Sequence, residues 1–160
     1  MFKHVVFTSA LLIGLAGAGA YGQTSPLSAE IKLSRTSVKN NELLSVSTII
    51  RNTSREDQSL VAWACGYGRQ WTSDSLSAQV NHGEPCLANA LVKVKLKPGN
   101  SYQKKIQVSV TLPAAGAPQE AVTFRLGFAS ERDQPAPAPA SGAATTPRLW
   151  SNAVTVTVTR

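Results

Sequence analysis

Apolar and polar residues alternate along several stretches of the chain, with the two-residue period of strands that bury one face. The clearest stretch covers residues 122–128, where Val, Phe, Leu and Phe occupy every second position. The same period recurs in residues 43–51, 91–97, 102–112 and 150–159. No stretch beyond the amino-terminal segment has the period of an amphipathic helix. The pattern therefore predicts an all-β protein.

Shorter or weaker alternations complete the predicted set of strands. Residues 30–33 and 58–65 each favour a strand, and residues 66–89 favour loops around one short strand. The signal for that short strand comes from Leu76, Ala78 and Val80. About seven or eight short strands separated by turn signals are typical of an antiparallel β-sandwich, with a closed barrel as the alternative.

Two connections carry specific turn signals. Asn52-Thr53-Ser54 follows a predicted strand and also has the N-glycosylation pattern, and we favour the turn interpretation because residues 52–57 form a polar, hairpin-type connection. Pro98 and Gly99 suit a type II turn, since proline sets the first central residue and glycine accepts the positive φ of the second. A tight hairpin here would place the apolar faces of the flanking strands on opposite sides. We therefore expect an arch from one sheet to the other.

The amino terminus has the features of a secretory signal. A basic start at Lys3 and His4 precedes an apolar run over residues 5–15, and Ala18 and Ala20 form the small-x-small pattern of a cleavage site. The apolar run is too short to span a membrane. We therefore expect a cleaved signal peptide and a periplasmic or extracellular mature protein that does not span the membrane.

The rest of the chain predicts one domain. Residues 1–20 are assigned to the signal peptide, residues 21–29 to a flexible leader and residues 30–160 to the β-sandwich. Within the domain, residues 133–147 are rich in Pro and Ala and are expected to form a flexible loop.

The two cysteines are expected to form one disulfide. Cys65 and Cys86 are the only cysteines of the chain, and export would place them in an oxidising compartment, where such pairs usually form disulfides. The bond would close a loop of about twenty residues, which is worth roughly 3 kcal/mol in the chain-entropy account.

A short motif resembles a known family. The sequence Leu-Lys-Pro-Gly-Asn-Ser-Tyr at residues 96–102 resembles the Leu-x-Pro-Gly-x-x-Tyr corner of fibronectin type III and related immunoglobulin-like domains. The resemblance implies an immunoglobulin-like sandwich in which the Tyr102 hydroxyl bonds back to the turn. Two predicted strands follow the Tyr102 strand, where the fibronectin module has one. The wider order of segments resembles a secreted bacterial envelope-type immunoglobulin-like module.

The same Asn turn and Leu-x-Pro-Gly motif are similar to the bacterial intracellular proteinase inhibitor family. The export signal and the expected disulfide depart from that family. Inhibition through a disulfide-held loop is therefore kept as the alternative function.

Candidate chemistry is sparse. His82 is the one histidine that would remain after signal cleavage, and no nucleophile motif accompanies it. A lone imidazole makes a poor metal site, and the acidic residues are scattered apart from Glu56 and Asp57. No glycine-rich loop precedes a helix. The sequence therefore predicts a protein that is not an enzyme and has no cofactor or metal.

A row of lysines is the first candidate binding surface. In residues 91–97, Val92, Val94 and Leu96 are expected to face the core, and Lys93, Lys95 and Lys97 to face outward. The row could dock an anionic partner, or it could simply protect an edge strand from aggregation. The formal net charge of +7 favours anionic envelope components. Nucleic acid is disfavoured because no aromatic side chain shares the lysine face.

The second candidate surface follows Cys65 and is the one expected to contact a specific partner, whereas the lysine row is expected to contribute only long-range attraction. Tyr67, Arg69 and Trp71 are of the residue types enriched at binding hot spots, and the disulfide would hold their loop. Tyr67 and Arg69 are expected at the surface, whereas Trp71 could either bind a partner or seal the core. The sequence thus predicts a non-enzymatic protein-interaction or envelope-assembly module whose partner is a protein or an anionic envelope component.

Overall fold

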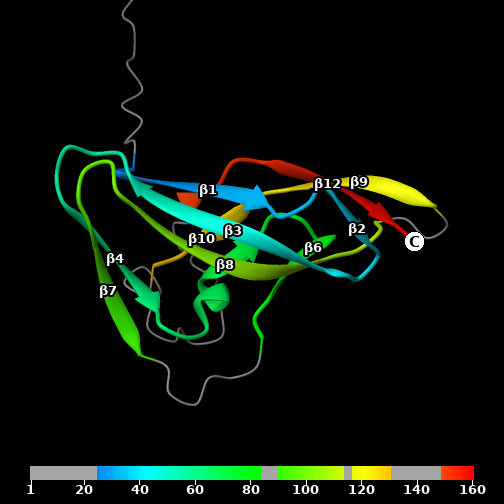
Figure 1. The fold of residues 1–160 in the computed structure, drawn as a ribbon, viewed down its shortest axis with the longest axis horizontal. Coiled ribbons are helices and arrows are strands. Elements are labelled where there is room, and N and C mark those ends of the chain that lie inside the picture. The colour runs from blue at the N-terminus through cyan, green and yellow to red at the C-terminus, as the bar shows by residue number, and fades with distance from the viewer. Residues whose placement is uncertain (1–24, 84–89, 114–116, 131–148) are drawn as a thin grey trace, which may run out of the picture.

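The computed structural model describes residues 25–83, 90–113, 117–130 and 149–160. These residues form strands and one short 3₁₀ helix, η1 (Tyr67–Gln70), which are shown in Figure 1. The largest sheet has the order β1-β3-β8-β6, and it consists of β1 (Leu27–Leu33), β3 (Leu43–Asn52), β8 (Ser101–Val110) and β6 (Ala78–Asn81).

The opposite layer contains two three-stranded sheets. The first has the order β11-β10-β5, with β11 (Leu149–Trp150), β10 (Leu126–Phe128) and β5 (Trp71–Ser73). The second has the order β2-β12-β9, with β2 (Ser37–Lys39), β12 (Val154–Thr159) and β9 (Gln119–Phe124). Because β9 continues into β10 and β11 into β12, the two sheets are successive parts of one layer.

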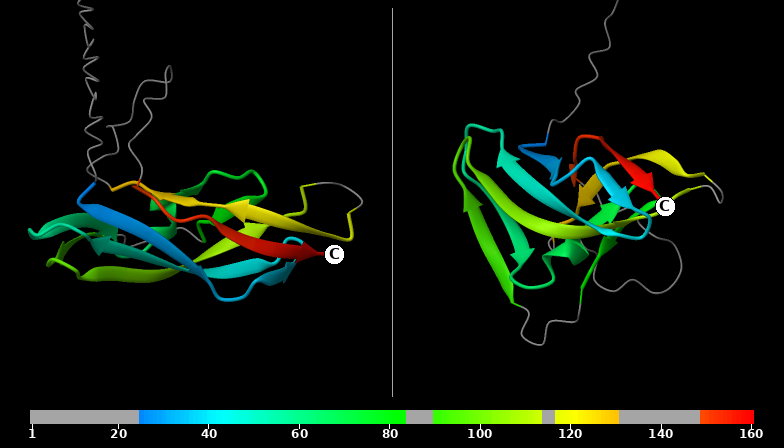
Figure 2. Two further views of the ribbon diagram at one scale, coloured as in Figure 1. Left: turned by 90° about the horizontal axis from the view of Figure 1, so that it is seen from above. Right: turned by 45° about the vertical axis from the view of Figure 1, so that its right-hand side comes forward.

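The strand order defines an immunoglobulin-like β-sandwich. The sheet β1-β3-β8-β6 corresponds to the A-B-E-D sheet of that fold, and the order of β5, β10 and β11 corresponds to its C-F-G sheet. The pairs are antiparallel except for β2 with β12, which are parallel. The views in Figure 2 show the two layers edge-on and obliquely.

Alternation places one face of each long strand in a shared core, as predicted. In β3 the buried positions are Leu44, Val46, Thr48 and Ile50. In β9 and β10 they are Val122, Phe124, Leu126 and Phe128. Side chains from both layers form one buried cluster, so the hydrophobic effect that drives folding acts across the two sheets together.

A two-stranded ribbon stands at one end of the sandwich. It consists of β4 (Gln58–Trp63) and β7 (Leu91–Leu96), which pair only with each other among the described strands. Strand β4 follows β3, and β7 precedes β8, so this β4–β7 ribbon extends the central strands of the large sheet. Strand β7 forms the outer margin of the molecule in Figure 1 and in the right view of Figure 2.

The prediction of seven to eight strands is wrong, since the described residues contain twelve. Two expected strands are each interrupted. Arg125 separates β9 from β10, and residues 151–153 separate β11 from β12. The second break turns Ser151 inward, where its hydroxyl accepts a hydrogen bond from the Leu126 amide at 3.0 Å. Trp150 therefore faces outward and lies flat against Gly127, where an added Cβ would be 3.0 Å from the indole ring.

Three further boundaries differ from the predictions. Strand β1 begins at Leu27, so residues 27–29 belong to the sandwich rather than to the predicted leader, because they pair with β3. The region predicted as loops around one short strand contains η1 and β5 as well as β6. In β7, Leu96 is buried but Val92 is 42% exposed, because the ribbon extends beyond the core.

The type II turn expected at Pro98 and Gly99 is confirmed. The Asn100 amide donates to the Lys97 carbonyl at 3.0 Å, and Gly99 has a φ of 77°, as a type II turn requires. Strand β7 pairs with β4, whereas β8 pairs with β3, so the turn joins the ribbon to the large sheet and is not the expected arch between the two layers of the sandwich. The tyrosine corner is not formed: among the described residues, no hydrogen bond joins the Tyr102 hydroxyl to the turn.

Asn52 holds this corner instead. Its side chain is fully buried, and Nδ2 donates to the carbonyls of Leu96 at 2.9 Å and Glu56 at 2.7 Å. Its Oδ1 accepts from the Ser54 amide at 2.9 Å. The turn interpretation of Asn52 is confirmed, and the nitrogen that a glycan would modify is buried in the folded protein.

We predict that Asn52→Ala lowers the free energy of unfolding by about 2 kcal/mol, because buried carbonyls lose their donor. Urea denaturation followed by tryptophan fluorescence measures the change. Asn100→Ala is the matched control, since Asn100 is exposed in the same corner and contributes only backbone hydrogen bonds. Equal stability of the two variants would show that the Asn52 side chain does not hold the corner.

Candidate functional site

The residues predicted to bind a partner lie around η1, where the β4–β7 ribbon meets the sandwich. Gly66 adopts a left-handed conformation with a φ of 75° and starts the 3₁₀ turn. This turn directs Tyr67 inward and leaves Arg69 exposed. Tyr67 is 5% exposed and Trp71 is 1% exposed.

Tyr67 and Trp71 belong to an aromatic cluster in which Tyr67, Trp71 and Phe128 are buried and Tyr102 is half-buried. Its members are Tyr67, Trp71, Tyr102 and Phe128, with ring centroids 5.2 to 6.0 Å apart in the contacting pairs. Edge-on and tilted contacts of this kind are favoured by the ring quadrupoles. The expectation that Tyr67 lies at the surface is wrong. For Trp71, the alternative in which it seals the core is confirmed, and the role of Arg69 in binding stays a prediction.

Burial raises the pKa of Tyr67 to about 12, although the nearby Thr48 hydroxyl and the Trp71 indole lower it. The hydroxyl of Tyr67 lies 3.4 Å from the Thr48 hydroxyl. The ammonium group of Lys104 covers the outer side of the aromatic cluster, 5.8 Å from the centroid of the Tyr67 ring. Lys104 also donates to the Ala64 carbonyl at 3.3 Å, so it joins the cluster to the chain that follows β4.

Gln70 ties the ribbon to the sandwich. Its side chain is 1% exposed. Oε1 accepts from the Trp63 amide at 2.9 Å, and Nε2 donates to the Val61 carbonyl at 3.0 Å. Nε2 also lies 3.3 Å from the Ala129 carbonyl, just after β10. The amide group therefore bonds the edge of β4 that faces away from β7, as a neighbouring strand would. Sequence reasoning missed Gln70, because a single glutamine in a predicted loop carries no pattern.

The lysine row lies on the ribbon, as predicted. Lys93, Lys95 and Lys97 are all exposed. Lys95 forms an ion pair of 3.0 Å with Asp57, in which both side chains are largely exposed, so the pair adds little stability. Leu91 and Val92 are 50% and 42% exposed beside the row. Leu91 lies on the lysine face of β7 and Val92 on the opposite face.

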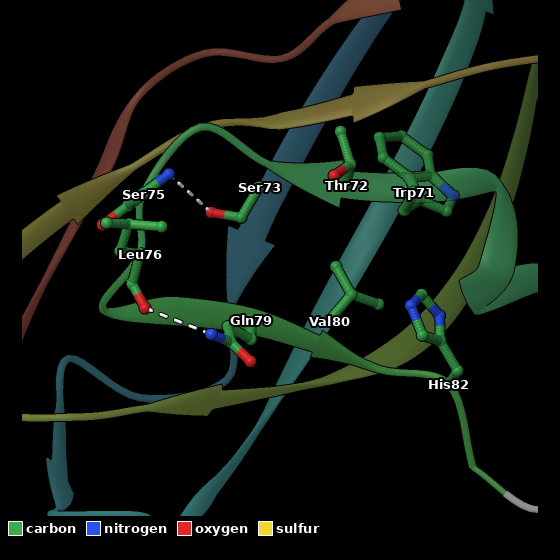
Figure 3. Close-up of a pocket in the computed structure, with 8 residues that line it drawn as sticks. All are labelled: Trp71, Thr72, Ser73, Ser75, Leu76, Gln79, Val80 and His82. Carbon is green, nitrogen blue, oxygen red and sulfur yellow. Dashed lines mark hydrogen bonds between the residues drawn. The ribbon is translucent and has the colours of Figure 1, made fainter. Parts of the chain in front are cut away.

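A shallow pocket of about 320 Å³ lies between β5 and β6. Figure 3 shows its lining, which includes Trp71, Ser73, Gln79 and His82. The Trp71 Nε1 is buried and has no hydrogen-bond partner among the described residues. No hydrogen bond joins His82 to a hydroxyl or carboxylate in the described part of the chain, and no three potential metal ligands gather there. The pocket therefore has no catalytic or metal-binding arrangement of described residues.

The predicted disulfide begins two residues after β4. Cys65 is half-buried, and the described residues contain no free cysteine. Cys86 lies outside the described residues, as do the predicted signal peptide and the Pro/Ala loop, so the Cys65–Cys86 pairing stays a prediction. In the described segments, no helix is long and apolar enough to cross a membrane.

Comparisons with known proteins add little. No protein-family model matches the chain, and no curated protein matches it. Among solved structures, the chain is similar to the ASH / PapD-like domain of human CEP192 (PapD-like domain 7). The identity is 10% over 96% of this chain and 94% of that one, with a TM-score of 0.27. A TM-score this low supports no inference, so the immunoglobulin-like assignment rests on the strand order described above.

We predict that stability falls as pH rises from about 10 to about 12, because unfolding lets Tyr67 ionise at the ordinary tyrosine pKa. Below pH 10 the hydroxyl is neutral in both states, and the contribution is fully present. Denaturation curves at several pH values should show that Tyr67→Phe reduces this loss by roughly 2 kcal/mol. An unchanged pH profile in Tyr67→Phe would contradict the buried, neutral state of the hydroxyl.

Proposed function

We propose that the protein is an exported, non-enzymatic interaction module that binds an envelope protein through the β4–β7 ribbon. The observation that carries this proposal is the combination of exposed Leu91 and Val92 with the exposed lysine row on one strand. Apolar side chains supply affinity when they are desolvated, and the lysines attract anionic partners over the longer range of screened charge.

The attachment of the ribbon supports this proposal. Gln70 holds β4 at the η1 end, and Asn52 holds the Leu96 carbonyl at the other end. A surface fixed at both ends loses little conformational entropy when it binds, which favours affinity. Scattered apolar side chains are common on protein surfaces, but the exposed Leu91 lies on the same face of β7 as Lys93 and Lys95, and the exposed Val92 lies on the opposite face.

The geometry of η1 does not favour the alternative of a proteinase inhibitor. An inhibitor of this kind would present an extended, exposed loop that a protease can grip. The segment proposed for that role forms a 3₁₀ turn whose Tyr67 and Gln70 side chains are buried, and the following Trp71 is buried too. Only Arg69 remains as an exposed side chain of the size that could enter a protease pocket.

Export and the disulfide are tested together by mass spectrometry of the protein recovered from the periplasm or medium. We expect a mature amino terminus near Tyr21 and no thiol that iodoacetamide alkylates before reduction. Reduction should release two alkylatable cysteines. Retention of residues 1–20, or alkylation without reduction, would contradict the predicted signal peptide or disulfide respectively.

Binding through the ribbon is tested with an acidic envelope protein, identified by crosslinking to the purified chain. The double change Leu91→Asp and Val92→Asp should weaken the complex at least about tenfold, since it removes the apolar contacts and opposes the charge of the partner. Leu76→Asp is the matched control, because Leu76 is 92% exposed on the turn between β5 and β6. Equal binding by both variants would place the site elsewhere.

A further inference from the structure

The edge strands differ in whether side chains bond their free backbone groups. In β1, the Asn152 side chain accepts from the Ile31 amide at 2.8 Å and lies 3.3 Å from the Ile31 carbonyl. In β4, Gln70 bonds Val61 and Trp63 in the same way. A side-chain amide thus occupies the place of a neighbouring strand on both edges, which prevents further strand pairing there.

Strand β7 has no such cover among the described residues. The Ala64 amide donates to the Ala90 carbonyl at 2.9 Å. Gln70 bonds the odd-numbered residues Val61 and Trp63, on the edge of β4 that faces away from β7. The even-numbered residues of the two strands therefore bond each other. The amides and carbonyls of Leu91, Lys93 and Lys95 point away from β4, and no described residue bonds them. We call these groups the open edge of β7.

Strand β9 provides a useful comparison. Its odd-numbered residues Gln119, Ala121 and Thr123 also point away from their partner strand, since the Arg160 amide bonds the Pro118 carbonyl on the paired side. Strand β9 has no exposed large apolar side chain, and its charged residue is Glu120. Of these two edges, the open edge of β7 is the one that combines unpaired backbone groups with exposed apolar and basic side chains.

We propose that the open edge of β7 accepts an extended segment of a partner protein as an added β-strand, and that this segment alternates acidic with apolar residues. The proposal rests on the proposed function and specifies how the ribbon binds. Backbone hydrogen bonds to an edge strand supply affinity, and the alternate side chains supply specificity.

The faces of β7 define the chemistry of that segment. Lys93 and Lys95 lie on one face of the ribbon, and a strand beside them would place every second side chain next to their ammonium groups. Acidic residues fit those positions. The opposite face carries the exposed Val92 and the half-buried Val94, so apolar residues fit the intervening positions.

A second copy of this chain is a poorer occupant. Antiparallel pairing of two β7 strands would bring the lysine rows of both copies together. Like charges that face each other across paired strands destabilise the pair. The lysines therefore disfavour self-association and favour an acidic partner at the same edge.

The test uses a fluorescent peptide of alternating Val and Glu, about seven residues long to match β7. Fluorescence anisotropy should show saturable binding to the full mature protein. Two N-methylated peptides are the central comparison, because methylation at the Glu residues or at the Val residues blocks the backbone on one side only. If the peptide pairs antiparallel to β7, methylation of the Glu amides should abolish binding and methylation of the Val amides should be tolerated. If it pairs parallel to β7, the Val amides are the ones whose methylation should abolish binding.

Variants of the protein locate the site. Lys93→Pro removes an outward amide and should weaken peptide binding at least about tenfold, whereas Ala121→Pro on the edge of β9 should leave it unchanged. Lys93→Gln with Lys95→Gln keeps the backbone, so its effect should be largest at low salt and decline at high salt. This double variant keeps the test decisive if Lys93→Pro does not fold.

Three outcomes would overturn the proposal. The first is an absence of saturable binding, and the second is an equal effect of the two methylation patterns. The third is a concentration-dependent dimer of the protein that Lys93→Pro dissolves, which would make a second copy the occupant. If envelope capture still depends on Leu91 and Val92 in any of these cases, the proposed function stands and strand addition alone is wrong.

Discussion

The backbone groups at the edges of the sheets impose the constraint on which this structure depends. Buried amides and carbonyls that lack a hydrogen-bond partner cost free energy. In an open sandwich, each edge strand has a neighbouring strand on one side only, so its other row of backbone groups needs a different partner. Gln70 resolves this for β4, because one side-chain amide bonds Trp63, Val61 and Ala129. It thereby fixes the ribbon against the end of β10, and the aromatic cluster closes over the same junction.

Two other carboxamides act in the same way at other places. Asn52 replaces the tyrosine of the expected corner and joins the end of β3 to Leu96 and Glu56. Asn152 bonds the exposed edge of β1 at Ile31. In contrast to these covered positions, the lysine-bearing edge of β7 combines unpaired backbone groups with exposed apolar and basic side chains. The functional proposal follows from this contrast between covered and open edges.

The sequence predicted the strands well wherever apolar alternation was long. Strands β3 and β8 and the β9–β10 segment lie where expected, and the type II turn at Pro98 and Gly99 follows from local chemistry alone. Alternation also placed the lysines of β7 outward correctly. It did not predict the exposure of Val92, because a two-residue period separates two faces without saying what covers either one.

The site was less predictable because its residues act through distant contacts. Tyr67 looked like a surface anchor, but its ring is buried by Trp71, Tyr102 and Phe128, which come from separate strands. The roles of Gln70 and Asn152 depend on backbone groups that no local pattern specifies. The outward turn of Trp150 likewise depends on the bond between the Ser151 hydroxyl and Leu126.

The most direct test of this account is amide hydrogen exchange in the free, mature protein, resolved by residue. We predict that the amides of Ile31 and Trp63, which donate hydrogen bonds to the side-chain oxygens of Asn152 and Gln70, exchange slowly. The amides of Lys93 and Lys95 should exchange rapidly, although they lie within a well-formed strand. Protection of Lys93 and Lys95 comparable to that of Trp63 would contradict the account, because the edge of β7 would then be covered in the protein on its own.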